Sequence, residues 1–274
     1  TLDQKLDQIK YVTFNPNGTQ LASESIKGTV QVWDVASGQL IRSLNGNAKR
    51  SSVMSLAYNF DGTRLMSVHV MNDRRIDHPR KVTVWDAVTG KETLTVEGQS
   101  LRGVTSGAIN PDGTRLATGS SDTTVKVWDA DTGQEVLTFK GHKGIVDTVT
   151  FSPDGKLLSS AGADGKVIVW NSATGDELFT HDGSFGPIKS LSFSSDGTRL
   201  AVGSFRGLVF VWDFASGQKT FKMISAQSAP IMSLSFSPDG TRLAASIGQA
   251  VKMWDAVTGQ EALTFSDHVG DISS

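Results

Sequence analysis

The 274-residue sequence predicts an all-β fold in which one four-stranded antiparallel sheet recurs six times. Three observations carry this prediction. The only tryptophans recur with spacings of 52, 43, 42, 42 and 42 residues, at Trp33, Trp85, Trp128, Trp170, Trp212 and Trp254. Each ends a short apolar run, and all but Trp170 are followed by aspartate. Turn pairs with glycine recur at similar offsets, and a repeat of about 40 residues with this regularity is typical of stacked or radial repeat folds.

The fourth repeat shows how each sheet is expected to form. Its first turn, Ser152-Pro153-Asp154-Gly155, has proline at the second position and glycine where a positive φ is needed. Asp164-Gly165 and Thr174-Gly175 mark the next two turns. Short connections of this kind join antiparallel neighbours. We therefore expect strands at 146–151, 156–161, 166–170 and 177–180.

The remaining repeats follow the same plan, with blades expected at about 9–44, 52–96, 103–139, 146–181, 188–222 and 231–265. One such sheet cannot cover two apolar faces, whereas six packed radially cover one another. This predicts a single β-propeller domain over residues 1–274. Residues 267–274 imitate the start of another repeat, so two alternatives stay open. The six blades close by themselves, or the chain is a cut piece of a seven-blade or longer array.

The units resemble WD repeats over essentially the whole chain. The motif W-D-A-x-T-G-Q-E at Trp128 and Trp254 also resembles the WD-repeat arrays of bacterial multidomain proteins. The family resemblance implies a hydrogen-bonded tetrad of histidine, serine or threonine, aspartate and tryptophan within a blade. Only the fourth repeat matches it fully, with His142, Ser160, Asp164 and Trp170.

Composition excludes several classes of function. With a net charge of −2 and a pI near 6.2, the protein has no overall positive charge to attract a polyanion, so nucleic acid is not expected as a partner. No stretch approaches 18 apolar residues, and no membrane association is expected. The start at Thr1 suggests an excised or processed piece. The absence of cysteine leaves the compartment open, with the cytoplasm favoured, and the oligomeric state is also open.

Enzymatic motifs are missing from the sequence. It contains no H-E-x-x-H, no phosphate loop and no G-x-S-x-G, and only His142 among its five histidines has a defined place. We therefore expect a protein that is not an enzyme and that has no cofactor and no metal.

The second repeat carries a charged insert, Val70 to Lys81. It holds four cations against Asp73 and Asp77, a formal charge of +2 with His78 neutral; the cations are Arg74, Arg75, Arg80 and Lys81. Guanidinium groups on one rim could bind a carboxylate or phosphorylated peptide. The alternative is a solvated loop whose charges serve solubility.

The resemblance also implies a partner surface at the mouth of the channel, on the face with variable loops. The side chains expected there are Ile26, Arg102, Ile145, Phe185, Phe205 and Ile247. Each could instead pack between blades. The resulting hypothesis is a scaffold that binds a protein or peptide, acidic or phosphorylated, on this face. The alternative is a ligand-sensing or glycan-binding propeller of a larger multidomain protein.

Overall fold

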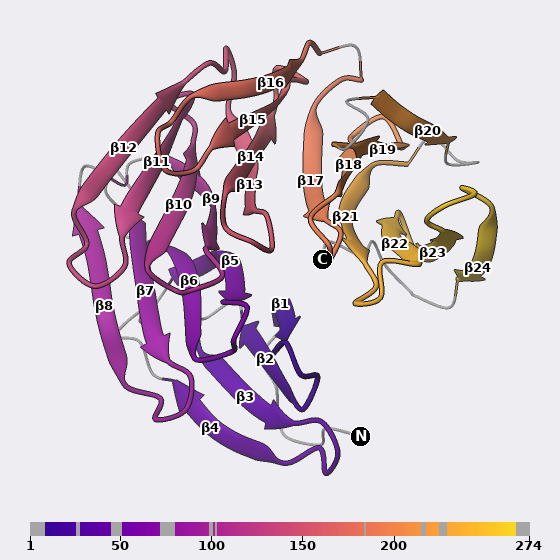
Figure 1. Cartoon of the computed structure of the whole chain (residues 1–274). Coiled ribbons are helices and arrows are strands. Elements are labelled where there is room, and N and C mark those ends of the chain that lie inside the picture. Colours follow the sequence, from indigo (N-terminus) through magenta and orange to yellow (C-terminus); the bar gives the residue numbers. More distant parts are fainter. Residues whose placement is uncertain are drawn as a thin grey trace. The chain divides into compact units, whose positions relative to one another are not determined.

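The computed structural model describes residues 9–25, 28–44, 51–71, 80–98, 101, 103–183, 185–214, 218–224 and 229–266. These residues form six four-stranded antiparallel sheets, the blades of a β-propeller, and the predicted fold class is confirmed (Figure 1). Within each blade the strands are hydrogen-bonded in sequence order. No helix in the described ranges is long and apolar enough to cross a membrane.

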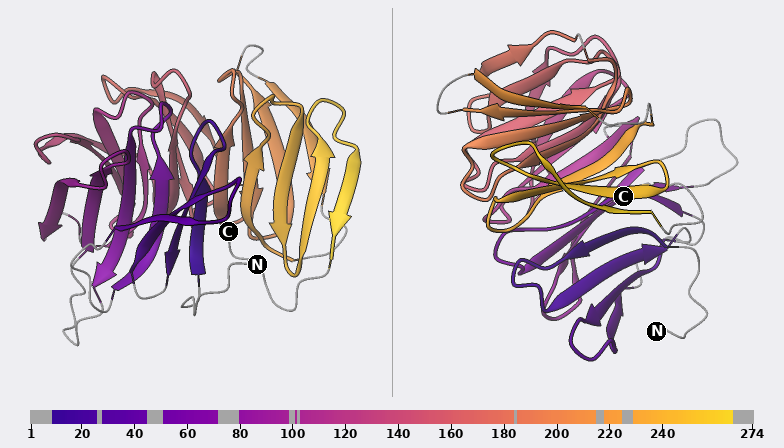
Figure 2. Two further views of the ribbon diagram at one scale, coloured as in Figure 1. Left: turned by 90° about the horizontal axis from the view of Figure 1, so that it is seen from below. Right: turned by 90° about the vertical axis from the view of Figure 1, so that its right-hand side faces the viewer.

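Blades 1 and 2 contain β1 Ile9–Phe14, β2 Gln20–Ser25, β3 Val30–Asp34, β4 Leu40–Leu44, β5 Ser51–Tyr58, β6 Arg64–Met71, β7 Arg80–Asp86 and β8 Glu92–Gly98. Blades 3 and 4 contain β9 Val104–Ile109, β10 Arg115–Ser120, β11 Thr124–Asp129, β12 Glu135–Lys140, β13 Val146–Phe151, β14 Leu157–Gly162, β15 Val167–Asn171 and β16 Glu177–His181. Blades 5 and 6 contain β17 Ile188–Phe193, β18 Arg199–Ser204, β19 Leu208–Asp213, β20 Gln218–Ile224, β21 Ile231–Phe236, β22 Arg242–Ile247, β23 Ala250–Asp255 and β24 Glu261–Phe265. Figure 2 shows the strands of blade 6 side by side, ending in the yellow β24.

The chain divides into two compact units, Thr1–Ser120 with Lys126–Thr138, and Ser121–Val125 with Phe139–Ser274. Both units have cores built in the same way, from strands that are covered on both faces. In β15, for example, Val167, Ile168, Val169 and Trp170 are all buried. A strand covered on both faces reads as a continuous apolar run instead of an alternating one, as it does before Trp170 and Trp212.

In blade 3 the tryptophan and the aspartate after it tie the strands together. Trp128 Nε1 donates to Thr118 Oγ1 at 2.9 Å, which links β11 to β10. The Asp129 carboxylate accepts from the backbone N–H of Thr132 at 2.9 Å, so it closes its own turn. Gly133 completes that turn at φ 71°, a conformation that glycine adopts without a steric penalty. The Trp-Asp pair is therefore structural in origin.

Thr123 lies in the turn before β11 at φ 74°, the one positive φ of a non-glycine residue in the described ranges. The corresponding turn of blade 4 has Gly165, at φ 73°. For an L-residue the left-handed conformation costs roughly 1–2 kcal/mol, and glycine removes this strain. Glycine also loses more conformational entropy on folding, which offsets part of the gain in stability. We expect Thr123→Gly to raise the free energy of unfolding by about 0.5–1 kcal/mol, measured by urea denaturation.

The matched control is Gly165→Thr. A Cβ on Gly165 would lie 3.0 Å from the carbonyl oxygens of both Gly183 and Gly186, so this variant should lose stability. A lower urea midpoint for Thr123→Gly than for the parent protein would contradict the strain assigned to Thr123.

Candidate functional site

The charged insert of blade 2 is partly strand. β6 and β7 continue through Val70 and Arg80, which are directly paired, so these parts of the insert belong to strands. The rest of the insert, residues 72–79 with Arg74, Arg75 and His78, lies outside the described residues, as do Ile26 and Arg102. The signal for these longer strands was the valine at every second position, Val68 and Val70 before the insert and Val82 and Val84 after it.

Arg80 and Lys81 therefore differ from the solvent-exposed rim residues that the sequence predicted. The Lys81 side chain is only 7% exposed, and its Nζ lies 3.5 Å from Glu97 Oε1. Arg80 Nε is buried without a hydrogen-bond partner, and burial lowers the pKa of this guanidinium. Both residues belong to the hairpin of blade 2, and Glu97 supplies the nearby partner that the buried Lys81 charge needs.

A buried acid and a buried histidine meet between blades 1 and 2. Glu24 on β2 is 0% exposed and His69 on β6 is 1% exposed. His69 Nδ1 lies 3.3 Å from Glu24 Oε1, while His69 Nε2 shares a short hydrogen bond with Ser67 Oγ. The Glu24 oxygens have no partner with hydrogen-bond geometry.

Burial decides the charges of this pair. It raises the pKa of Glu24 to about 9, and burial with nearby Lys81 lowers the pKa of His69 to about 4. The two atoms lie at ion-pair distance, but desolvation penalises both charged forms more than their attraction favours them. At neutral pH the pair is a carboxylic acid beside a neutral imidazole.

In blade 4 the four residues of the expected tetrad form one hydrogen-bonded chain. Trp170 Nε1 donates to Ser160 Oγ at 2.8 Å, and His142 Nε2 lies 2.8 Å from the same oxygen. His142 Nδ1 is 3.1 Å from Asp164 Oδ2, which also accepts from the Lys143 N–H at 2.8 Å. Burial lowers the pKa of His142 although Asp164 opposes the shift.

Blade 2 contains a similar chain of polar side chains, formed by residues at different positions of the repeat. His69 approaches the serine from within its own strand, two residues away and on the same face, and the acid comes from the neighbouring blade. Ser67, His69 and Glu24 are the residue types of a hydrolytic triad, but none is more than 1% exposed, so Ser67 Oγ is closed to substrate. Among the described residues, no group of three or more histidine and acidic side chains could hold a metal ion.

The residues expected at the channel mouth divide into two groups. Ile145 and Phe205 are 42% and 48% exposed, whereas Phe185 and Ile247 are only 7% and 2% exposed. The exposure predicted for the latter pair is therefore not found. Both are core residues of the second unit, Phe185 in the cluster around Trp212 and Ile247 in the cluster around Trp254.

Aromatic packing explains the burial of Phe185. Its ring stacks on His181 at 4.4 Å and contacts Phe210 at 3.6 Å between ring centroids. Rings in such arrangements gain contact energy beyond the area they bury. The loop before β17 therefore turns Phe185 inward, an outcome set by the neighbouring blade.

A third exposed apolar side chain at the mouth was missed from the sequence. Met232 is 37% exposed and occupies a β-bulge in β21, between Ile231 and Ser233. The equivalent bulges of β13 and β17 hold Asp147 and Lys189, and Lys189 Nζ lies 2.9 Å from Asp147 Oδ1. A bulge turns one side chain out of the regular alternation, which binary patterning does not reveal.

Comparison with known proteins places the chain in a family. The family model described as IFT122 first beta-propeller matches residues 75–274, and the WD domain, G-beta repeat matches residues 1–34. A WD repeat-containing protein WDS homolog of Arabidopsis thaliana is 27% identical over 126 residues, 46% of this chain and 23% of the relative. Cilia- and flagella-associated protein 52 of Chlamydomonas reinhardtii is 28% identical over 141 residues, 52% of this chain and 21% of the relative.

These matches span less than a quarter of the length of either relative, and neither relative is bacterial. The family model covers well over half of the chain, and the repeat model accounts for the first repeat. The chain therefore belongs to the WD-repeat β-propellers, in the family of the IFT122 first beta-propeller.

Proposed function

We propose that the protein is a scaffold that binds a peptide segment of a partner protein through the channel-mouth face of its second unit. WD-repeat propellers typically mediate protein–protein interaction and are generally not enzymes. The binding surface is named here the mouth patch, and it consists of Ile145, Asp147, Lys189, Phe205 and Met232.

Exposed apolar side chains at one end of neighbouring inner strands carry this proposal. β17 lies between β13 and β21 and contacts both (Figure 1). The bulges occupy equivalent positions in all three strands. The backbone N–H of Phe205 donates to Pro187 O at 2.7 Å, which holds Phe205 beside the start of β17. Exposed apolar side chains with polar residues beside them are typical of a protein-interaction site.

The charges next to the mouth patch favour an acidic segment. Lys143 and Arg206 are both exposed, and the Arg206 side chain lies against Gly186. Within the mouth patch Asp147 is already paired with Lys189. An acidic or phosphorylated peptide would meet a positive surround while its apolar residues contact Phe205 and Met232. Arg74, Arg75 and His78 of the blade 2 insert stay a separate proposal for contacts with an acidic segment.

The test uses an array of blocked peptides of equal apolar content in acidic, phosphorylated and neutral versions. We expect acidic members to bind, and Phe205→Ala to release the best binder about 10-fold faster, equivalent to about 1.4 kcal/mol. Lys143→Glu with Arg206→Glu should instead slow association and weaken its dependence on salt, because exposed charges act on encounter. Surface plasmon resonance separates the two effects.

The control is Phe60→Ala. Phe60 is 62% exposed but belongs to the turn between β5 and β6 in the other unit. Equal effects of Phe60→Ala and Phe205→Ala on release would contradict binding at the mouth patch.

A further inference from the structure

A hollow of 240 Å³ opens between blades 4 and 5 of the second unit. Its main lining residues are Leu157, Leu178, Phe179, Trp212, Asp213 and Phe214. The volume is below the roughly 300 Å³ of sites that enclose whole small molecules, so it suits a single side chain. The lining is apolar apart from Asp213, and Leu178 at its rim is 55% exposed.

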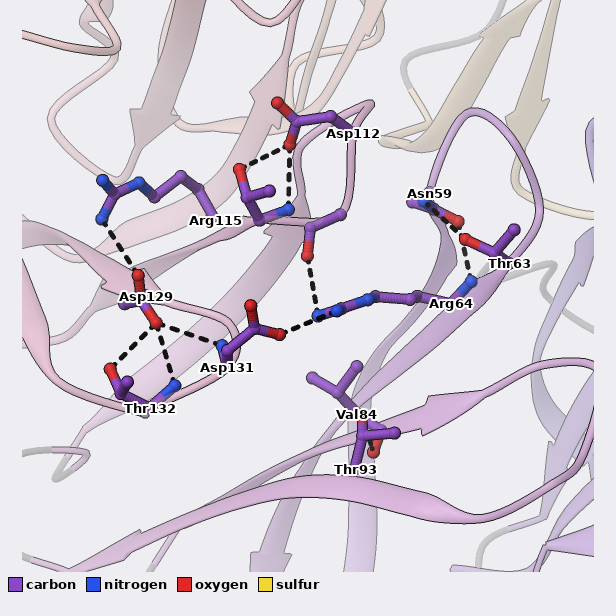
Figure 3. A network of polar contacts seen from close by, with 12 residues as sticks. Asn59, Thr63, Arg64, Val84, Thr93, Asp112, Arg115, Asp129, Asp131 and Thr132 are labelled. Carbon is purple, nitrogen blue, oxygen red and sulfur yellow. Dashed lines mark hydrogen bonds and ion pairs between the residues drawn. The ribbon is translucent and has the colours of Figure 1, made fainter.

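Between blades 2 and 3, in the first unit, an arginine crosses from one blade to the turns of the next. Arg64, the first residue of β6, donates from Nη1 to the carbonyl oxygen of Gly113 at 3.1 Å. Its Nη2 lies 2.7 Å from Asp131 Oδ1 (Figure 3). The guanidinium thus joins two turns of blade 3 to blade 2.

Blades 5 and 6 of the second unit are joined in the same way. Arg199, the first residue of β18, donates to Gly240 O at 2.7 Å and to Ala256 O at 3.3 Å. Its Cζ lies 5.3 Å from the centre of the Phe236 ring. The second strand starts with arginine in blades 2, 3, 5 and 6, and Arg64 and Arg199 use it to reach carbonyl oxygens of the next blade. Arg115 of blade 3 instead lies 3.7 Å from Asp129 of its own blade.

Blade 4 has leucine at the equivalent position. Leu157 pairs with Asn171 across β14 and β15, as Arg199 pairs with Asp213 across β18 and β19. A leucine side chain is too short to reach the turns of the next blade and has no donor.

Beside blade 5, the position that corresponds to the guanidinium groups of Arg64 and Arg199 is therefore unfilled by the Leu157 side chain. A Cβ on Gly113 would lie 2.9 Å from Arg64 Cδ, whereas one on Gly197, the equivalent glycine of blade 5, would meet only Pro153 Cδ at 3.5 Å. In the described part of the chain, no side chain donates to the carbonyl oxygens of Gly197 and Phe214. These carbonyls correspond to the acceptors that Arg199 uses in blade 6.

We propose that this hollow binds an arginine side chain of a partner polypeptide. The alkyl part of the arginine packs on Leu157 and Phe179, and its guanidinium stacks on an aromatic ring of the lining. The guanidinium donates to the free carbonyls of blade 5, as Arg199 does in blade 6, and the Asp213 carboxylate adds a favourable potential. A lysine ammonium offers neither the planar fork nor the stacking surface and should bind less well.

The first experiment measures binding of a blocked tripeptide with arginine at its centre, followed by the indole signal of Trp212 in NMR titrations. The matched ligand carries citrulline, which has the same shape without the charge. We expect the arginine peptide to bind at least 10-fold more tightly. Equal affinity of the two peptides would overturn the proposal, because it would show an apolar groove indifferent to guanidinium.

Leu178 provides a matched pair of variants that leave the fold intact, because its side chain is exposed. Leu178→Glu should tighten binding of the arginine peptide several-fold, and Leu178→Lys should weaken it by a similar factor. Both effects should shrink at high salt. Losses of equal size in both variants would mean that Leu178 acts through apolar contact alone and would overturn the charge assignment.

Leu157→Arg fills the hollow from within the chain. We expect it to abolish peptide binding and to raise the Tm by about 2–4 °C, the shift that about 1 kcal/mol produces in a protein of this size. Unchanged binding in a folded Leu157→Arg protein would overturn the proposal, and the Leu178 pair decides the matter if that variant does not fold. Phe205→Ala should leave arginine binding unaltered, so the experiments test this hollow independently of the mouth patch.

Discussion

Replacing Glu24 by glutamine should stabilise the protein by up to about 5 kcal/mol at pH 8, because keeping Glu24 protonated costs about 1.4 kcal/mol for each pH unit above its ordinary pKa of 4.5. Glu24 is fully buried, and its carboxyl oxygens lack hydrogen-bonding partners. At alkaline pH wild-type Glu24 must therefore keep a proton that the unfolded chain gives up. Glutamine has the shape of the protonated acid and carries no such cost.

The effect should depend on pH in a defined way. The folded pKa of Glu24 is raised from its ordinary 4.5 to about 9, so its contribution to stability is complete below pH 4.5 and is lost as pH rises toward 9. The folded pKa of His69 is lowered from 6.5 to about 4, so its contribution is present above pH 6.5 and is lost as pH falls toward 4. Between 4.5 and 6.5 the two slopes oppose each other, and above 6.5 the protein should lose stability by up to about 1.4 kcal/mol per pH unit.

Urea denaturation from pH 4.5 to 9 measures this profile. Glu24→Gln should remove the alkaline slope and match the wild-type protein at pH 4.5. The control is Glu92→Gln on β8, which removes an exposed carboxylate and should change little at any pH. An unchanged alkaline slope in Glu24→Gln would contradict the neutral, buried state of this acid.

Loss of Asp164 should destabilise the protein by about 1–3 kcal/mol, because His142 and backbone donors are left without their acceptor. Its carboxylate accepts from the N–H groups of Lys143 at 2.8 Å and Lys166 at 3.1 Å in addition to facing His142. His142→Ala should have an effect of similar size, since it leaves Asp164 facing a cavity. Thermal and urea unfolding both report the change.

Asp182→Ala is the matched control for this prediction. Asp182 Oδ1 lies 3.1 Å from Lys166 Nζ, but its side chain is 83% exposed, so the pair should contribute less than about 1 kcal/mol. Equal melting shifts for Asp164→Ala and Asp182→Ala would contradict the structural role given to the tetrad.

The repeat architecture was predictable because the local signals in each repeat agree. Turn residues fix where a hairpin reverses, and Asp129, Asp255 and, after Trp170, Asn171 each close their own turn through bonds within a few residues. Such contacts depend only on sequence neighbours, so they read the same in every repeat. The tetrad of blade 4 was accessible for the same reason, as its members lie within one repeat.

The candidate site was less predictable, because it depends on what covers each strand. Phe185 precedes β17 and Phe205 follows β18 at the same end of blade 5, yet one is stacked in the core and the other is exposed. The insert of blade 2 read as a charged loop, but pairing with Val70 draws Arg80 into β7. Hairpin extension is decided by hydrogen-bond pairing across the blade, and a charge count does not report it.

The sequence by itself determined the number of repeats, the four strands of each and the chemistry of their turns, since all of these rest on local conformational preferences. Only the tertiary structure decided that Glu24 meets His69 and that Leu157 leaves a hollow where Arg64 and Arg199 form bridges. Each of these features joins residues of neighbouring blades roughly one repeat apart. A one-dimensional pattern states which side chains share a face, whereas the packing of one blade on the next determines what that face contacts.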